Sequence, residues 1–462
     1  MAQQLSNEQG IPLISSQKGT REGRYSMISA CFNFVNSIIG SGVIGLPYAL
    51  NQAGLPFGFL LLIIVAFITD YTIILLIKGG NLSGTTSYQS LVQSTFGFPG
   101  FLVLSVLQFL YPFIAMISYN ITTGDTLTKV FQRIPGVGPD HILADRHFVI
   151  VLSTVLCTLP LSLYRNIGRL GKVSFLSMIL TAIIVVIVII RAATLGPQIP
   201  PTEGAWLFAK WNAIQAVGVM SFAFICHHNS FLIYASLEKP TLTNWTRVTH
   251  VSVGSSLIIS ATFALAGYVT FTGYTQGMCE YQHVDFSSTS RTEWLFVVVW
   301  QGDIFENYCR NDNLATFGRF CFGLSIIMTF PLECFVTREV VSSSIFGREL
   351  SKVEHMSVTV IIVAACTAVS LAYDCLGIVL ELSGALSATP LIFIIPSACF
   401  IKLSPGRWYH SENLIPAMLI VLGVFVMITG LMLTVLNPQD CSHGVEMFYC
   451  RDANFSGTQA PV

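Results

Sequence analysis

Long apolar runs separated by short polar stretches dominate this chain. A helix needs roughly 20 predominantly apolar residues to cross the hydrocarbon core of a bilayer. Runs of about that length recur along the sequence, and we predict a transmembrane helix for each. There are eleven, at about 26–50, 56–78, 99–123, 147–163, 171–192, 212–236, 250–272, 314–337, 356–375, 378–402 and 412–436.

The composition fits this pattern. Of 462 residues, 53% are hydrophobic and only 10% are charged, whereas about 25% are charged in ordinary soluble domains. Lipid must therefore cover much of the surface, and we predict an all-α polytopic membrane protein. A net charge of -1 without a basic run excludes nucleic acid as a partner. The sequence contains no GxSxG, P-loop, HExxH or dinucleotide fingerprint, so an enzyme or a bound cofactor is not expected.

The order of the spans suggests an internal repeat. Five spans fall in 25–192 and five in 212–402, followed by one extra span at 412–436. An odd number of spans per half gives the halves opposite topology, and such inverted repeats bind substrate near the midplane through interrupted helices. We therefore expect a five-plus-five inverted repeat plus one helix, within a transporter domain at 25–436.

Lysine and arginine counts predict the orientation. With the N-terminus inside, inner segments hold 14 of the 23 Lys and Arg and outer segments hold 9, in line with the positive-inside rule. Residues 1–24 are then a cytoplasmic tail, and 437–462 lie outside with a glycosylation acceptor at Asn454. Two pairs in polar outer segments, Cys441–Cys450 and Cys279–Cys309, could form disulfides in an oxidising compartment.

The first span contains an expected helix break. Three glycines and Pro47 fall within eight residues from Gly40, which weakens the helix and frees backbone groups. A break at Gly40–Gly42 would point a helix N-terminus at a carboxylate, and free carbonyls would suit Na⁺ or an ammonium group. Asn33 and Asn36 lie on the face that ends at this break. The alternative is that the small residues only allow close helix packing.

The sixth span contains a second expected interruption, in the run Cys226-His227-His228-Asn229-Ser230. Adjacent residues project about 100° apart on a helix, so both histidines face one ligand only if the helix unwinds. Ionisable residues inside spans are by default functional hypotheses. For His227 the alternatives are a substrate or coupling role and a satisfied core histidine.

The eighth span carries a polar stripe at a spacing of four: Cys321, Ser325, Thr329 and Glu333. Pro331 in the same helix leaves the carbonyl of Ile327 without its helical partner. Hydroxyls and free carbonyls are ligands that an alkali cation prefers. The alternative is a kinked helix whose hydroxyls bond back to its own backbone.

These segments resemble one known family. The stretch from Asn36 to Ala49 resembles the first-span signature of the amino acid/auxin permease family, in particular its sodium-coupled neutral amino acid transporters. Phe224-Ile-Cys-His227, Thr329-Phe-Pro331 and Gly384–Pro390 resemble the family's sixth, eighth and tenth spans. The resemblance implies eleven spans, the bacterial leucine transporter fold and alternating access to a midplane site.

Site roles follow from that resemblance. It implies that Asn36 and Thr329 bind sodium and that the Gly40–Gly42 backbone binds the substrate carboxylate and amine. The full predicted substrate set is Asn33, Gly40, Ser41, Gly42, Tyr119, Phe224 and His227. The predicted Na⁺ set is Asn36, Ile39, Ser325, Ile327 and Thr329.

Two segments depart from the family pattern. The 193–211 loop is short and lacks a sequon, which leaves the family's usual loop disulfide in question. In the outer loop 273–313, residues 278–302 resemble an insert. Cys279 then belongs to the insert, which makes Cys441–Cys450 the stronger disulfide candidate.

The sequence thus predicts a secondary transporter that couples Na⁺ to the uptake of neutral L-amino acids, in the plasma membrane or alternatively an endolysosomal one. One rival is proton coupling through His227 or His228, because only histidine changes charge near neutral pH without a large perturbation. Another is an amino-acid sensor that transports little. The expected partners are the amino acid, Na⁺ as the co-transported ion and the lipid bilayer.

Overall fold

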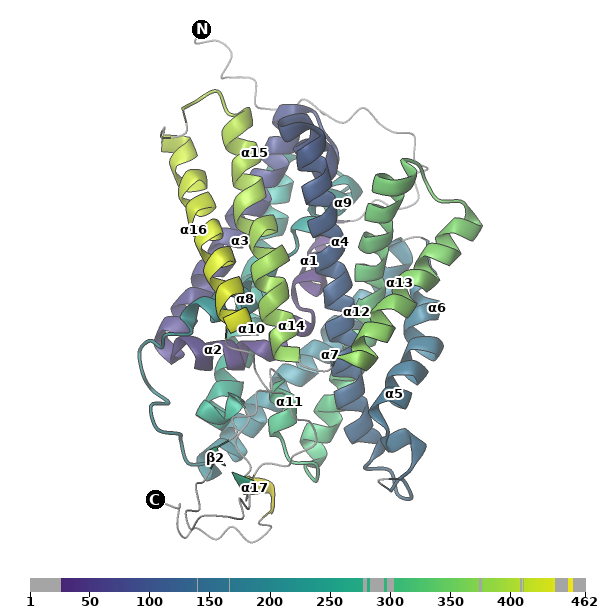
Figure 1. The fold of residues 1–462 in the computed structure, drawn as a ribbon, viewed down its shortest axis with the longest axis vertical. Helices are drawn as coiled ribbons and strands as arrows, with labels where there is room; N and C mark the ends of the chain where they lie inside the picture. The colour runs from purple at the N-terminus through teal and green to yellow at the C-terminus, as the bar shows by residue number, and fades with distance from the viewer. Residues whose placement is uncertain are drawn as a thin grey trace, which may run out of the picture.

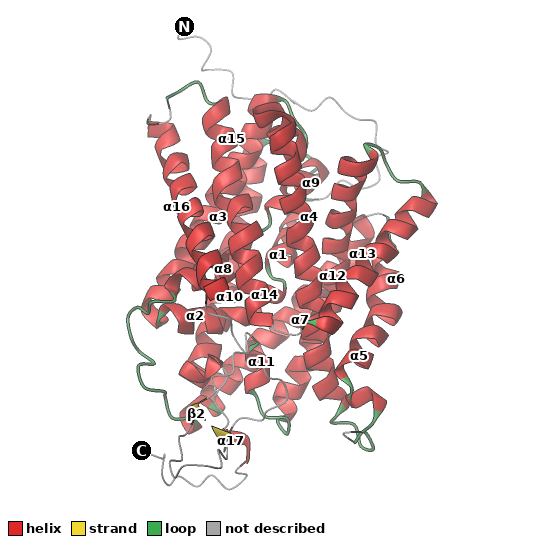
Figure 2. Ribbon diagram, viewed as in Figure 1, coloured by secondary structure: helices red, strands yellow, loops and turns green. Residues whose placement is uncertain are grey.

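The computed structural model describes residues 26–276, 281–282, 295–296, 303–436 and 448–451, except 139, 166, 374–375, 408 and 410. Helices run mainly along the long axis of the molecule, as Figures 1 and 2 show. Two strands of two residues, β1 (Tyr281–Gln282) and β2 (Leu295–Phe296), pair antiparallel with Tyr281 opposite Phe296.

The helices follow one another with short connections. The α-helices are α1 (Met27–Ile38), α2 (Leu46–Ala53), α3 (Leu55–Ser83), α4 (Tyr88–Phe131), α5 (Arg146–Ser153), α6 (Leu159–Ser162), α7 (Ile167–Thr194), α8 (Ala213–Phe224), α9 (His227–Ser236), α10 (Leu242–Phe271), α11 (Ile304–Asn307), α12 (Asn313–Val341), α13 (Lys352–Ala372), α14 (Leu376–Ser383), α15 (Ile395–Leu403), α16 (Ser411–Leu436) and α17 (Phe448–Arg451). Single 3-10 or π turns connect or extend them: η1 (Ser41–Gly45), η2 (Ile142–Ala144), η3 (Thr154–Thr158), η4 (Gly196–Gln198), η5 (Thr272–Gln276), η6 (Ser342–Phe346), η7 (Gly384–Ala388) and η8 (Pro390–Ile394).

The described part of the chain contains nine helices long and apolar enough to cross a membrane, and a tenth span if α1 and the following helix are counted as one bent pair. The multi-pass prediction is therefore confirmed. The predicted span at 147–163 corresponds to a shorter apolar helix, Arg146–Ser162. A count of eleven spans and the inverted repeat stay predictions.

The third predicted span is longer than expected. Instead of 99–123, α4 covers 44 residues, and Gly97 bends it with a φ of 73°. That backbone region is open to glycine but strained for residues with a Cβ. The sequence before Pro99 is polar enough to resemble a loop, but a capping box at Ser87 and Ser90 starts the helix earlier.

Burial separates central from peripheral helices. In the apolar window of each span, 89% of the α8–α9 residues and 78% of the α12 residues are buried inside the protein, against 22% for α16. α12 packs on α4 and α7, while α8 packs on α2. In Figure 1, α16 lies at one edge of the bundle and α5 and α13 at the other. Helices buried on all sides are where polar groups find protein partners rather than lipid.

Neither predicted disulfide is present, because Cys309 bonds Cys450, with their Cα atoms 5.4 Å apart. The sequence predicts a different partner for each of these two cysteines, and a cysteine can form only one disulfide. Cys279 and Cys441 lie outside the described residues. The short helix α17 brings Cys450 back to the α11 end of the bundle, where Tyr449 stacks on Phe271. A contact across 141 residues cannot be read from local spacing.

Candidate functional site

The predicted break in the first span is present. α1 ends at Ile38, and the 3-10 turn η1 separates it from α2. The two helical halves of the span, Met27–Ile38 and Gly42–Ala53, are bent by 50°. Gly40 has the non-helical angles φ -101° and ψ -148°. The glycine-rich sequence thus interrupts the helix where local physics predicts, and it leaves backbone groups outside the regular hydrogen-bond ladder.

The predicted interruption of the sixth span is also present. α8 ends at Phe224, Ile225 is extended, and α9 starts at His227. The residues from Phe224 to His227 are all fully buried. Unwound backbone at membrane depth is tolerated only where protein or a water-filled cavity surrounds it. The helix therefore breaks inside the bundle and not at its surface.

The two breaks contact each other. A Cβ at Gly42 would lie 2.7 Å from the Cα of Ala223, near the end of α8. A Cβ at Gly40 would lie 2.5 Å from the hydroxyl oxygen of Tyr119 on α4. The structure thus places Gly40 against Tyr119, and Gly42 against Ala223, which precedes Phe224 in α8. At Gly42 a side chain would meet the backbone of Ala223, whereas at Gly40 it would meet the end of the Tyr119 side chain.

The adjacent histidines point to different helices, as their spacing predicts. His227 Nε2 lies 3.0 Å from Thr72 Oγ1 on α3. The His228 ring packs 4.9 Å from the Tyr111 ring on α4, and its Nε2 lies 3.3 Å from a carboxylate oxygen of Glu333 on α12. The two imidazoles therefore do not converge on one ligand, even though the helix is broken before them.

The hydroxyls of the predicted Na⁺ set lie in a cluster between α7 and α12. Ser177 Oγ lies 2.7 Å from Ser325 Oγ and 3.2 Å from Thr329 Oγ1, and Thr181 Oγ1 lies 3.5 Å from Ser325 Oγ. Thr329 also donates to the Ser325 carbonyl at 2.9 Å. We call these four residues the hydroxyl cluster. Its oxygens bond each other, so a cation there would replace these hydrogen bonds with ligation.

The remaining predicted residues are distributed around the first break and α12. Asn36 is buried, and its Nδ2 has no hydrogen-bond partner among the described residues, while Asn33 is half-buried. Ile39 follows the last residue of α1. The Ile327 side chain packs with Leu127 and Val149 in a small apolar cluster, so only its carbonyl is a candidate ligand. The side chain of Ser41 lies outside the described residues.

Several polar residues at this site lie outside the predicted sets. Ser177 and Thr181 on α7 form, with Ser174, a polar stripe at helical spacing inside an apolar run. Tyr111, Asn229 and Glu333 are also absent from the predicted sets. Glu333 had the clearest signal, because a carboxylate inside an apolar span is expensive.

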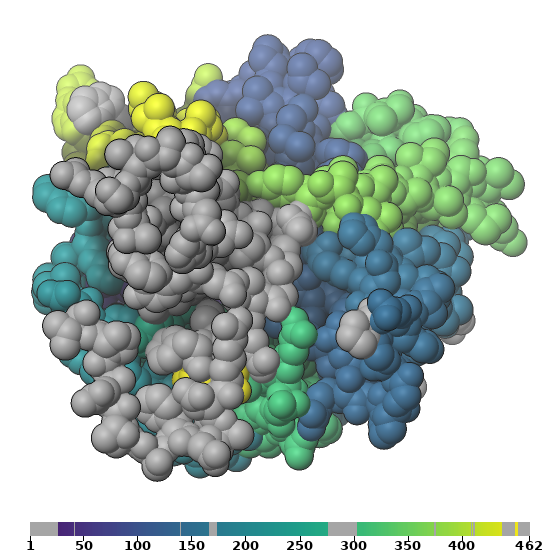
Figure 3. Space-filling model, turned by 60° about the horizontal axis from the view of Figure 1, so that its bottom comes forward, coloured from purple at the N-terminus to yellow at the C-terminus, as the bar shows by residue number. Residues whose placement is uncertain are grey.

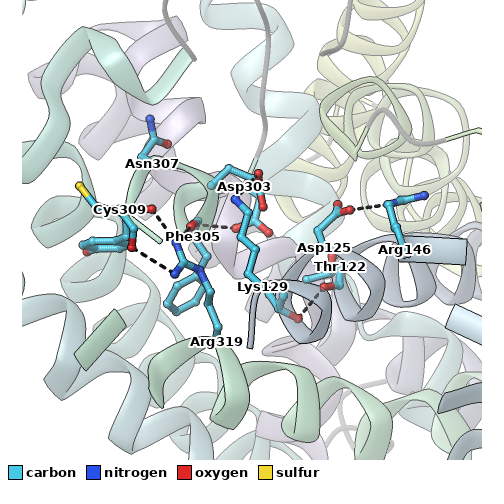
Figure 4. Close-up of polar contacts among 12 residues, drawn as sticks. Thr122, Asp125, Lys129, Arg146, Asp303, Phe305, Asn307, Cys309 and Arg319 are labelled. Atoms are coloured by element: carbon cyan, nitrogen blue, oxygen red, sulfur yellow. Dashed lines mark hydrogen bonds and ion pairs between the residues drawn. The ribbon is translucent and has the colours of Figure 1, made fainter. Parts of the chain in front are cut away.

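A network of charged side chains occupies the α11 end of the bundle (Figure 4). Lys129 on α4 pairs with Glu306 on α11 at 2.5 Å, and Asp125 pairs with Arg146 at 2.5 Å. Arg319, buried in α12, donates to the carbonyls of Phe305, Tyr308 and Cys309. In Figure 3, which turns this end toward the viewer, the green segment of α11 and α12 lies beside the blue α4 and α5.

Asp303 caps α11 within this network. Its Oδ1 accepts from the Phe305 amide at 2.7 Å, and its Oδ2 has no partner among the described residues. Burial, reinforced by the nearby Glu306 carboxylate, raises the pKa of Asp303 to about 8. The folded protein therefore holds this carboxyl largely protonated near neutral pH.

Comparison with known proteins places the chain in a family. The family model described as "Transmembrane amino acid transporter protein" matches residues 23–284 and 294–436. The chain belongs to the transmembrane amino acid transporter family. The segment between the two matched ranges, 285–293, falls in the stretch that resembles an insert.

Curated members of this transporter family match almost the whole chain. A Danio rerio protein named "Putative sodium-coupled neutral amino acid transporter 11" is 66% identical, over 97% of this chain and 95% of its own length. The Homo sapiens protein of the same name is 59% identical, over 88% of this chain and 95% of its own length. The "Vacuolar amino acid transporter 2" of Saccharomyces cerevisiae is 30% identical, over 94% and 88%.

Among solved structures, an Eremococcus coleocola manganese transporter has a similar fold. The two structures align with a TM-score of 0.52 at 12% sequence identity. The alignment covers 90% of this chain and 88% of the manganese transporter. At that identity the likeness concerns the fold alone. The family expectation of an amino acid transporter is thus confirmed, and its ion coupling belongs to the proposal that follows.

Proposed function

We propose that this protein couples Na⁺ to the uptake of neutral L-amino acids by alternating access. The observation that carries the proposal is the contact between two interrupted helices, with Gly42 against Ala223, in the buried centre of the bundle. Interrupted helices leave backbone amides and carbonyls free for the carboxylate and ammonium groups of an amino acid. The names of the related transporters support both the substrate class and the ion.

In this proposal the substrate binds at the two breaks. The backbone of residues 40–42 receives the carboxylate and amine, and Asn33, Tyr119, Phe224 and His227 contribute surrounding contacts. Na⁺ binds between the first and eighth spans at Asn36, Ile39, Ser325, Ile327 and Thr329. The hydroxyl cluster supports this assignment, because it gathers hard oxygen ligands around two of these residues. It adds Ser177 and Thr181 as candidate ligands from α7.

The proposal includes an orientation. The N-terminus is cytoplasmic, and the α11 end faces outward in the plasma membrane. The Cys309–Cys450 disulfide supports this orientation, because disulfides persist on the oxidising side of a membrane. Asn454, outside the described residues, is the proposed glycosylation site of the outer tail. The eleven-span, five-plus-five arrangement is also part of the proposal, supported by breaks in the first and sixth spans.

The experiment is uptake of labelled amino acids into proteoliposomes, with Na⁺ replaced by choline at matched pH. The T329A variant should raise the Na⁺ concentration for half-maximal uptake by about tenfold or more, which corresponds to about 1.4 kcal/mol of lost ligation. The matched control is T337A. Thr337 is also buried on α12 and bonds its own helix at 2.9 Å, but it lies two turns away.

Three outcomes separate the alternatives. Uptake that needs Na⁺, and that shifts in T329A but not in T337A, supports the coupling and the site. Uptake independent of Na⁺ overturns the coupling and leaves proton coupling as the rival. Amino-acid binding without flux overturns transport and favours the sensor.

A further inference from the structure

The loop 204–212, between η4 and α8, exposes large apolar side chains. Trp211 is 98% exposed, and the exposed fractions of its apolar neighbours are 57% for Trp206, 54% for Leu207 and 66% for Phe208. Single exposed apolar side chains are normal on a surface, but a contiguous group marks an interaction site. In Figure 1 this loop, drawn in teal, lies at the left edge of the bundle beside α2. We call these four residues the apolar patch.

The polar side chains of the loop bind inward. Lys210 Nζ donates to Asn51 Oδ1 at 2.7 Å, and Asn212 Nδ2 donates to Gln52 Oε1 at 2.8 Å. Both partners lie on α2, the second half of the broken first span. Lys210 is the one charged residue in the sequence of this loop. A loop in water shows the reverse arrangement, with charged groups outside and apolar groups packed inward, so this loop favours an apolar surrounding.

Backbone hydrogen bonds hold the loop in this orientation. The Lys210 amide donates to the carbonyl of the last residue of α2 at 2.9 Å, and the Phe57 amide on α3 donates to the Phe208 carbonyl at 3.1 Å. The Tyr268 hydroxyl on α10 donates to the Ala205 carbonyl at 2.5 Å. The loop is therefore bonded to three helices, and its apolar side chains are exposed although its backbone is held in place.

The apolar patch continues a lipid-facing surface. The Phe208 ring lies 6.1 Å from the ring of Phe57, in the first turn of α3. Further along α3, Leu60, Ile64 and Phe67 follow at helical spacing and are 46%, 39% and 68% exposed. On a membrane span, exposed apolar side chains such as these face acyl chains. The patch therefore adjoins the lipid-covered surface at the end where α3 begins.

We propose that the apolar patch inserts into the phospholipid interface and thereby anchors α2. Tryptophan is typical of that region because its apolar ring carries an N–H donor. The inserted side chains lie about 5–10 Å into the boundary between headgroups and acyl chains. Lys210 and Asn212 connect the anchor to α2, so that lipid holds one half of the broken helix at the proposed substrate site. The consequence for uptake rests on the proposed function, whereas the lipid contact does not.

The fluorescence of single-tryptophan variants in phosphatidylcholine nanodiscs tests the lipid contact. The chain has six tryptophans, and one variant keeps Trp211 while the other five are replaced by Phe. Bromines on the acyl chains near the headgroups should quench Trp211 about twofold or more, because the ring lies at that depth. Acrylamide in the water should quench it weakly. The matched control keeps only Trp245, which is fully buried on α10 and should respond to neither quencher.

Two results would overturn the lipid contact. Strong quenching of Trp211 by acrylamide but not by lipid would mean that the loop faces water. Quenching by neither would mean that protein, such as a second copy of this chain, covers the patch. If the multiple variant does not fold, W211F in the otherwise unchanged chain should lower the lipid-quenched fraction of the fluorescence. An unchanged fraction in W211F would contradict the insertion of this ring.

Two double variants test the anchoring of α2. F208S/W211S removes the apolar groups, whereas F208L/W211L keeps the loop apolar. Hydrogen exchange of the 46–53 backbone should rise several-fold only in the serine variant, and amino-acid uptake into proteoliposomes should fall several-fold in that variant alone. Equal exchange in the two variants would overturn the anchoring. Absence of uptake in the wild type would instead overturn the proposed function, because the fluorescence and exchange measurements do not depend on transport.

Discussion

At the scale of single residues, the close approach of η1 to the end of α8 limits which residue can occupy position 42. Gly42 lies where η1 meets the end of α8, and there is no room for a side chain between them. Because the nearest atom would be the backbone of Ala223, a rotamer change cannot relieve the clash. Glycine at this position therefore allows the two broken helices to approach each other closely.

We expect Gly42→Val to lower the free energy of unfolding by about 1–3 kcal/mol through overpacking and to reduce transport. Thermal unfolding in detergent and uptake in proteoliposomes measure the two effects. Gly254→Val on α10 is the control, because no atom lies within 4 Å of a Cβ there. Equal melting temperatures for the two variants would contradict the close approach of the breaks.

Asp303, which lies outside the membrane spans, should make the stability of the folded protein depend on pH. Its pKa, about 8 in the folded protein, is above the ordinary value of 3.8, so protonation favours the folded state. Its stabilising contribution is fully present below about pH 4 and is lost as pH rises toward 8. We expect the melting temperature of the wild type to fall more steeply over this range than that of Asp303→Asn. Parallel curves for the two proteins would show that Asp303 is not held protonated.

At the scale of elements, α11 depends on its neighbours, because a four-residue helix is too short to be stable alone. Arg319 on α12 donates to three carbonyls around it, and Lys129 on α4 pairs with Glu306. These contacts hold α11 across the ends of α4 and α12.

We expect Arg319→Met, which removes the charge but keeps most of the volume, to leave these carbonyls unpaired. The cost should be about 1–3 kcal/mol for each buried unsatisfied group, and hydrogen exchange of the 303–309 backbone should rise. Arg133→Met is the control, since its bonds to Asn311 and Asn313 are exposed. Unchanged exchange in Arg319→Met would mean that α11 is held by other contacts.

At the scale of the whole molecule, the Cys309–Cys450 bond closes a loop of 141 residues between α11 and the end of the chain. We expect Cys450→Ser to lower the free energy of unfolding by roughly 2–5 kcal/mol. Cys309→Ser and the double variant should show the same loss, because all three remove one bond. Cys157→Ser, at an exposed free cysteine, should have little effect. Peptide mapping without reduction measures the pairing directly, and a Cys441–Cys450 peptide would contradict it.

Much of the fold and part of the site could be predicted because their causes are local. Apolar run length is typical of membrane spans, and all but one of the predicted ranges correspond to a long apolar helix or a bent pair. The breaks at Gly40–Gly42 and before His227 follow from glycine and from consecutive polar residues inside apolar segments. The divergence of His227 and His228 follows from helix geometry alone.

The tertiary structure decided the contacts between segments that are far apart in the chain. Cys309 forms a disulfide with Cys450, Ser325 hydrogen-bonds Ser177, and His228 contacts Glu333. The partners in each pair are so far apart in the sequence that no local pattern predicts the contact. By itself, the sequence determined the class of protein, the positions of the spans and where two of them break, because backbone propensity and hydrophobic length act within a segment. Packing decided which polar groups share a buried environment, because that depends on every helix at once.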